Sequence, residues 1–320
     1  SGYDYKVVQK TDTGSIVVKP AVAEPEVNVS DKISESDKTA VENAAKSVEV
    51  PTLGAAAGDK VAAISKTDAE SLVAKAETLT NPTLYVQTAL KVEPTAYDAA
   101  NKTLALEITP QYRVVASTAD KADEIKLNGD DKNAQVVQDY QKLTITAPTE
   151  ISMQLPDGFA TAGNKLSIKH IKDNGTVEYY TGKVTADGGK LYLTFTTNGF
   201  SPFTISTATA SIGETMYPTL AEAIAKAANG NAVKLEKNCT ESVSVSGKSL
   251  TIDKNNHEYD FAEVTVDSNS TKTENGDTLT ITYTAPSYYS GGSSSDPTYS
   301  VSTPSKTEHG TVTVSPKSAS

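Results

Sequence analysis

Residues 165–205 read KLSIKHIKDNGTVEYYTGKVTADGGKLYLTFTTNGFSPFTI, and this stretch decides the fold class. Leu166, Ile168 and His170 alternate with polar residues, which is the period of a half-buried strand. Asp173-Asn174-Gly175 follows, and Asn-Gly between alternating strands is the strongest short-range hairpin signal. We predict a three-stranded meander plus an edge strand. The later landmarks are a return strand over 177–184, the turn Asp187-Gly188-Gly189, a third strand with Leu191, Leu193 and Phe195, and an edge strand with Phe200, Phe203 and Ile205.

The period of two extends upstream to residue 84, so we assign 84–207 to one β-sandwich-like domain in which the meander packs on earlier strands. Two further apolar sets alternate with polar residues and indicate those strands. They are Leu104, Leu106 and Ile108, and Leu143, Ile145 and Ala147.

Residues 31–83 have a helical period instead, and we expect a helical subregion that packs on the next domain. Ser34 and Asp37 stand three apart, as in a helix cap, and residues 54–58 (GAAAG) are expected to be a loose connector. A second helix should begin with a capping box at Thr67. The two apolar stripes are Val41, Ala44, Ala45 and Val48, and Leu72, Val73, Ala76 and Leu79.

Residues 208–284 form a different unit, which we expect to be β-helix-like. Thr219 and Glu222 make a capping box for a short helix, and Gly230 suits its C-terminal cap. The strands that follow are too short to bury an apolar face alone, so we expect them to stack, with the helix as a cap. Their apolar pairs are Val233/Leu235, Val243/Val245, Leu250/Ile252, Val264/Val266 and Leu279/Ile281.

The remaining segments lie at the two ends of the chain. Residues 1–30 are expected to contain one or two short strands around Asp12-Thr13-Gly14, as the end of a preceding β domain or an extended strand segment. Residues 285–298 are a Gly/Ser/Pro linker by composition. Residues 299–320 open a further β repeat with its strand at 311–314. The predicted fold class is therefore mainly β and multidomain.

Composition excludes several classes of function. The formal net charge is −11 and Arg113 is the only arginine, whereas binding to phosphate backbones needs clustered Lys and Arg. Nucleic-acid binding is thus excluded, and anionic membrane surfaces are disfavoured. The chain has neither the run of about 18 apolar residues that inserts into a membrane nor a signal peptide pattern. We interpret it as part of a longer exported protein.

Three motifs, taken in order, resemble the long modular surface proteins of Gram-positive gut anaerobes, many of which carry S-layer homology domains. They are Leu155-Pro156-Asp157-Gly158-Phe159 with the downstream segment 199–205, then residues 212–224, which resemble the opening of β-helix-type repeats, and then residues 309–316, which resemble a bacterial surface repeat. The resemblance covers about two thirds of the chain. It implies export, a bacterial cell-surface location and modular β architecture, and it implies no catalytic residues.

The residue types needed for catalysis are scarce. A hydrolase triad needs a histidine beside a nucleophile, and His170, His257 and His309 fall in three separate units. We interpret His170 as a structural strand histidine and the other two as solvent-facing. Cys239 is the only cysteine, which excludes an intrachain disulfide, and we interpret it as a small buried apolar residue. Among 40 acidic residues, no pair is singled out by its spacing as a glycosidase pair.

No cofactor is predicted, and calcium stays open as a weaker alternative. Three oxygen-rich turns could supply calcium ligands, but ordinary turn geometry also explains each of them, and none has the spacing of a calcium loop. They are Asn128-Gly129-Asp130-Asp131, Asp173-Asn174-Gly175 and Asp187-Gly188-Gly189.

We therefore predict a non-enzymatic extracellular scaffold module that acts as a spacer or in surface-layer or filament assembly. Its partners would be further copies or other surface proteins. The alternative is an adhesin or carbohydrate-binding module. Aromatic rings stack on sugars, and Tyr179, Tyr180 and Tyr192 lie on neighbouring predicted strands as candidate glycan contacts.

Overall fold

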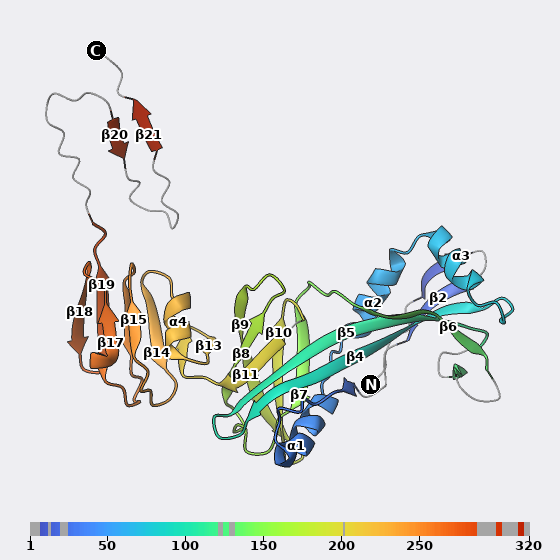
Figure 1. Ribbon diagram of the computed structural model, residues 1–320, viewed down its shortest axis with the longest axis horizontal. Helices are drawn as coiled ribbons and strands as arrows, with labels where there is room; N and C mark the ends of the chain where they lie inside the picture. The colour runs from blue at the N-terminus through green and yellow to red at the C-terminus, as the bar shows by residue number, and fades with distance from the viewer. Residues whose placement is uncertain are drawn as a thin grey trace.

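A computed structural model describes residues 7–11, 14–19, 25–120, 124–127, 132–200, 202–286, 299–302 and 313–316. The chain is mainly β with several sheets, which confirms the mainly β part of the prediction (Figure 1). Parts of three predicted features lie outside the described residues: the turn at Asp12-Thr13, the turn at 128–131 and most of the 285–298 linker.

One large sheet contains eleven strands in the order β1-β2-β4-β5-β11-β8-β9-β10-β7, with β3 paired to β4 and β6 paired to β5. The strands are β1 Val7–Thr11, β2 Gly14–Lys19, β3 Glu26–Val27, β4 Thr83–Asp98, β5 Thr103–Ser117, β6 Ala134–Lys142, β7 Thr149–Gln154, β8 Lys165–Ile171, β9 Val177–Asp187, β10 Lys190–Thr197 and β11 Pro202–Thr207.

The predicted meander is present as β8, β9 and β10, each antiparallel to the next. The prediction that the fourth strand, β11, is an edge strand is wrong. It is a central strand, because Phe203 is paired both with Leu106 of β5 and with His170 of β8. Sequence alternation shows that a strand is half-buried, but it does not show how many neighbours the strand has.

Three helices precede β4: α1 Glu35–Lys46, α2 Leu53–Ala62 and α3 Lys66–Ala74. The predicted loose connector at 54–58 lies inside α2, because alanine favours the helix and Leu53 and Ala57 are buried. The cap of α3 is Ser65, whose hydroxyl accepts a hydrogen bond from the Asp68 amide, rather than the predicted Thr67.

The extended segment 143–147 is not a strand of the sheet, although its sequence alternates. Leu143 and Ile145 are buried as expected, but Ala147 is exposed. One apolar core joins α1, α2 and α3 to the large sheet and runs from Ile33 to Ile205. We call residues 25–207 the first unit.

A second, separate apolar core runs from Ala210 to Ile281, and we call residues 208–284 the second unit. Its six-stranded sheet has the order β13-β12-β14-β16-β19-β18, and β15 pairs with β17 in a second sheet. The elements are β12 Ala210–Ile212, β13 Thr215–Tyr217, α4 Leu220–Lys226, β14 Asn231–Leu235, β15 Val243–Val245, β16 Leu250–Asp253, the 3-10 turn Phe261–Glu263, β17 Val264–Val266, β18 Ser270–Asn275 and β19 Thr278–Tyr283.

Successive turns of the second unit lie on one another at a spacing of about twenty residues. β14 pairs in parallel with β16, and β15 in parallel with β17. Side chains bond the turns at the same spacing: Asn229 Oδ1 accepts from the Ser249 amide, and Asp267 accepts from the Gly247 amide, both at 2.7 Å. Short strands are therefore held by neighbouring turns of chain.

The helix α4 takes the place of a strand in the turn before β15. At its start, the Glu241 carboxylate accepts hydrogen bonds from the Leu220 and Ala221 amides, both 3.1 Å long. At its end, the Lys248 ammonium donates to the carbonyls of Ile224 and Ala227 at 2.6 and 2.9 Å. Both charges match the helix dipole, so the turn that contains β15 clamps α4 at both ends.

Two details of this unit differ from the prediction. The helix ends at Lys226, and Gly230, with φ of +84°, lies in the loop before β14 instead of capping α4. The strand β18 has no apolar alternation and was not predicted. At the C-terminal end, β20 Tyr299–Ser302 pairs with β21 Thr313–Pro316, which overlaps the predicted strand at 311–314.

Candidate functional site

The junction between the two units joins distant parts of the chain through several polar contacts. The connector between β11 and β12 is two residues long, Ala208 and Thr209, and both are buried. The Thr209 amide donates to the Tyr217 carbonyl, and its carbonyl accepts from the Glu236 amide, both at 2.9 Å. The connector is therefore bonded into the second unit and is not a free hinge.

The Glu222 carboxylate on α4 lies at the centre of the junction. It accepts hydrogen bonds from Lys169 Nζ of β8 at 2.5 Å and from the Tyr179 hydroxyl of β9 at 2.9 Å. Burial would raise the pKa of this carboxyl, but the hydrogen bonds from Lys169, Thr219 and Tyr179 outweigh burial and hold the pKa below its ordinary value. Glu222 is thus a charged link between the units at neutral pH.

Further contacts surround Glu222. The Tyr179 ring packs on the core of the second unit, 4.8 Å from the Tyr217 ring. The Thr181 hydroxyl donates to the Glu214 carbonyl at 2.7 Å and accepts from the Met216 amide at 3.1 Å, so β9 meets the edge strand β13. An ion pair joins Lys165 to Glu214. In Figure 1 the two units lie end to end along the long axis of the molecule.

The structure does not bring the three candidate tyrosines together. Tyr179 and Tyr180 are successive residues of β9 and therefore point to opposite faces of the sheet. Tyr179 lies in the junction, and the Tyr180 hydroxyl donates to Glu178. Tyr192 pairs with Thr185, on the same face as Tyr179 but about 20 Å away along the strand. They do not form a single stacking platform.

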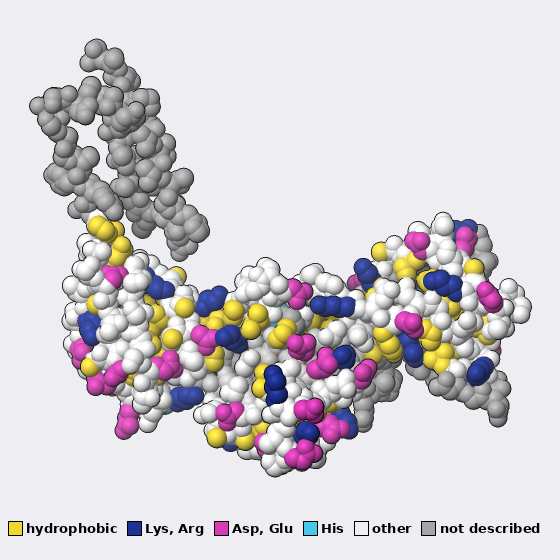
Figure 2. Space-filling view, in the orientation of Figure 1, with side chains coloured by type: hydrophobic (Ala, Val, Ile, Leu, Met, Phe, Trp, Pro, Cys, Tyr) yellow, Lys and Arg dark blue, Asp and Glu magenta, His cyan; other side chains and the backbone are white. Residues whose placement is uncertain are grey.

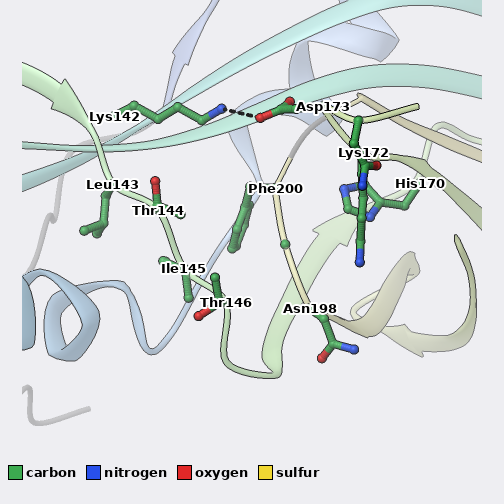
Figure 3. A pocket seen from close by; sticks show the side chains of 12 residues that line it. Lys142, Leu143, Thr144, Ile145, Thr146, His170, Lys172, Asp173, Asn198 and Phe200 are labelled. Carbon is green, nitrogen blue, oxygen red and sulfur yellow. Dashed lines mark ion pairs between the residues drawn. The ribbon is translucent and has the colours of Figure 1, made fainter. Parts of the chain in front are cut away.

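A pocket of 370 Å³ opens in the first unit between the extended segment 143–146 and the end of β8. Figure 3 shows Phe200 between the two walls, with the ion pair of Lys142 and Asp173 (3.7 Å) across one end. The pocket residues are Lys142, Leu143, Thr144, Ile145, Thr146, His170, Lys172, Asp173, Asn174, Asn198, Gly199 and Phe200.

His170 forms part of the wall of this pocket, yet only 1% of it is exposed. Its ring stacks on Phe203 with 4.8 Å between centroids, and its Nδ1 lies 3.7 Å from the Glu178 carboxylate. Burial lowers the pKa of His170, and the Glu178 charge only partly offsets this. Lys172 and Tyr180 hydrogen-bond to Glu178 and lower its pKa. A neutral, stacked imidazole fits the predicted structural role.

The other candidate residues are dispersed. Cys239 is buried, and burial raises the pKa of its thiol, so it is protonated at neutral pH. His257 is half-buried, in contrast to its predicted exposure, and His309 lies outside the described residues. Arg113 lies 4.8 Å from the Tyr140 ring centroid and donates to Gln87.

Within the residues that the structure describes, no group of three or more His, Cys, Asp or Glu residues could hold a metal ion. Of the turns considered for calcium, Asp173 pairs with Lys142, and Gly188 and Gly189 take the positive φ of a tight turn. No described helix is both long and apolar enough to cross a membrane.

Sequence reasoning missed the junction. The capping box correctly placed Glu222 at the start of α4, where the Thr219 hydroxyl accepts from the Glu222 amide. It gave no sign that the same carboxylate reaches Lys169, 53 residues away. A polar residue that serves a cap and a distant partner has the same local pattern as one that serves the cap alone.

Comparison with known protein families, curated proteins and solved structures gives no match for this chain.

Proposed function

We propose that this chain is a non-enzymatic scaffold module of an extracellular bacterial surface protein, in which the two units form a stiff spacer. The observation that carries the proposal is the junction, where a buried two-residue connector and the hydrogen bonds to Glu222 join the units. Domains that move relative to one another have exposed linkers and few contacts across them. A spacer needs the opposite arrangement.

The finer architecture belongs to the same proposal. The first unit is sandwich-like, in that α1 contacts both β4 and β7, although five strands lie between them in the sheet order, so the sheet curves around one core. The second unit is β-helix-like, in that it has parallel pairs at a spacing of about twenty residues and a helix in place of one strand. The two separate cores support modules at 25–207 and 208–284. The surface location rests on the resemblance of the sequence motifs.

Small-angle X-ray scattering on the full chain tests the spacer. We expect a maximum dimension that corresponds to units arranged end to end. When each unit carries one label, the distribution of distances between the two labels should be narrow. Tyr179→Ser removes the ring and hydroxyl from the junction and should broaden that distribution. The matched control is Tyr192→Ser, on the same sheet face but outside the junction. A wild-type chain whose units reorient as freely as those of the variant would refute the stiff spacer.

Glycan binding is a second candidate function. The open pocket beside Phe200 is a better candidate site for it than the dispersed tyrosines. An aromatic ring beside hydroxyl and amide side chains (Thr144, Thr146 and Asn198) is a suitable setting for one sugar ring. A glycan screen with the wild type and Phe200→Ala decides this point. Saturable binding that Phe200→Ala abolishes and Tyr192→Ser keeps would place an adhesin function at this pocket.

A further inference from the structure

The strand β18 is the last strand of the six-stranded sheet and lies at one end of the molecule (Figure 1). The other edge strand of this sheet, β13, is covered by Thr181 and β9 of the first unit. On β18, Thr271 to Asn275 are exposed, and within the described residues β19 is its only strand partner. Such an edge presents unpaired N–H and C=O groups to another strand.

Antiparallel alternation fixes which residues present those groups. The Thr284 amide donates to the Asn269 carbonyl, so residues 269, 271, 273 and 275 have their backbone groups directed at β19. Lys272 and Glu274 therefore direct theirs outward. The Ser270 amide is already bonded to the Asp267 carbonyl. The available edge is thus the backbone of Lys272 and Glu274.

We propose that the edge of β18 binds the β18 edge of a second copy of this chain, antiparallel and centred on Thr273. Backbone hydrogen bonds between the copies can form only where residues with outward-directed backbone groups, Lys272 and Glu274, lie opposite one another. The two-fold axis of the pair must therefore pass through residue 272, 273 or 274. Centres at 272 and 274 would place Lys opposite Lys or Glu opposite Glu. The centre at 273 places Lys272 opposite Glu274 in both directions, and opposite charges across strands are stabilising.

The side chains fit this register. Thr273 meets Thr273 of the second copy in a pair without backbone bonds, where side chains approach most closely. The Lys272 ammonium donates to the Val264 and Phe261 carbonyls at 2.7 and 3.3 Å, so its charge is held in place beside the edge. In Figure 2 this end of the molecule is mostly white, the colour of the backbone and of side chains that are neither hydrophobic nor charged, with scattered charged and hydrophobic side chains. Backbone pairing and charge, rather than apolar burial, would hold the copies together.

The consequence is a two-fold symmetric dimer in which two rods meet at their β18 ends, because an isologous pairing closes on itself. This inference deepens the proposed scaffold role by naming its partner as a second copy. It can fail separately: a strictly monomeric chain with a stiff junction leaves the spacer standing, and a dimer of flexible chains refutes the spacer alone.

Sedimentation over a range of concentrations tests the pairing in the full chain. We expect a reversible monomer–dimer equilibrium that salt weakens, since the pairs are of opposite charge. Glu274→Lys places Lys opposite Lys at both positions and should weaken dimerisation roughly tenfold or more, with salt now strengthening it. Glu77→Lys is the charge-matched control on an exposed helix-flanking site of the first unit. A monomeric wild type, or a Glu274→Lys variant that dimerises equally well, would overturn the proposal.

Crosslinking tests the register in a Cys239→Ala background. Thr273→Cys should form an intermolecular disulfide on oxidation, because it faces its own copy at a Cβ separation of roughly 5 Å. Asn275→Cys alone should not crosslink, since the register puts it opposite Thr271, whereas the double variant Thr271→Cys, Asn275→Cys should. Equal crosslinking of Thr273→Cys and Asn275→Cys, or of neither, would contradict the register.

Discussion

In the first unit, β4 and β5 pair along 16 and 15 residues, whereas the longest strands of the second unit, β18 and β19, have six residues. A long antiparallel hairpin fixes its own register, because each apolar side chain on one face has a cross-strand neighbour. The three-residue strands β15 and β17 cannot do this. Their register depends on polar bonds such as the one from the Gly247 amide to the Asp267 carboxylate and on the clamp around α4.

The comparison indicates that substitutions destabilise the two units in different ways. In the first unit, stability is concentrated in the close packing between long strands, so a change in side-chain volume matters most. In the second unit, each turn of chain supports the next, so the loss of an end affects every turn. Four variants test this difference, from the largest expected effect to the smallest.

Ile224→Asp should unfold the second unit as a whole. Ile224 is 4% exposed on the inner face of α4, and an unpaired buried carboxylate costs about 4 kcal/mol or more. Hydrogen exchange should show loss of amide protection at 243–252 while β8 and β9 keep theirs. The control is Ala225→Asp, which adds the same charge at an exposed position of the same helix. Both variants keep Glu222 and Lys226, so a difference between them reports the effect of burying the carboxylate. Retained protection at 243–252 in Ile224→Asp would show that α4 is not a cap.

Gly182→Ala should destabilise the first unit through overpacking. A Cβ at this position would lie 2.4 Å from Leu193 Cδ1 and 3.1 Å from Ile168 Cδ1, in the core between β8 and β10. Overpacking of this kind costs about 1–3 kcal/mol. Urea denaturation followed by a probe in each unit should report the loss in the first unit. Thr185→Ala, on the opposite face of β9, is the control, and equal stability of the two variants would be inconsistent with a tightly packed sheet.

Lys248→Met should loosen the end of α4 without emptying the core. The ammonium binds the Ile224 and Ala227 carbonyls, and burial lowers its pKa. Charged hydrogen bonds at a helix terminus are worth about 1–2 kcal/mol in such settings. The thermal midpoint of the second unit should fall by a few degrees, with Lys234→Met, at an exposed position of β14, as the control. An unchanged thermal midpoint would show that the hydrogen bonds of Lys248 do not stabilise the second unit.

His170 should give the first unit a mild sensitivity to acid between pH 7 and 5. Its pKa in the folded protein is below the ordinary 6.5 because of burial, so the unfolded chain binds the proton more readily. The stability that neutral His170 contributes is therefore present above about pH 6.5 and is lost as the pH falls through the folded pKa. His170→Gln should flatten the stability of the first unit between pH 7 and 5, as measured by urea titration at each pH. The same slope in the variant and the wild type would assign the acid effect to other groups.

The sequence by itself determined the mainly β class, the meander β8–β10, the capping box at Thr219 and most short strands of the second unit. These features are local: alternation, Asn-Gly turns and caps act within a few residues. It also determined that His170 is buried, since a histidine in phase with Leu166 and Ile168 faces the core.

Only the tertiary structure decided the central position of β11, the helix at 53–62 and the link from Glu222 to Lys169. It also showed β18, whose polar sequence STKTEN lacks apolar alternation because neither the core nor a second neighbour requires it. For β11 and for Glu222, the deciding partner lies far away in the chain. Backbone bonding and charge pairing between such partners leave no period in the sequence, and they arise only when the fold brings the two segments together.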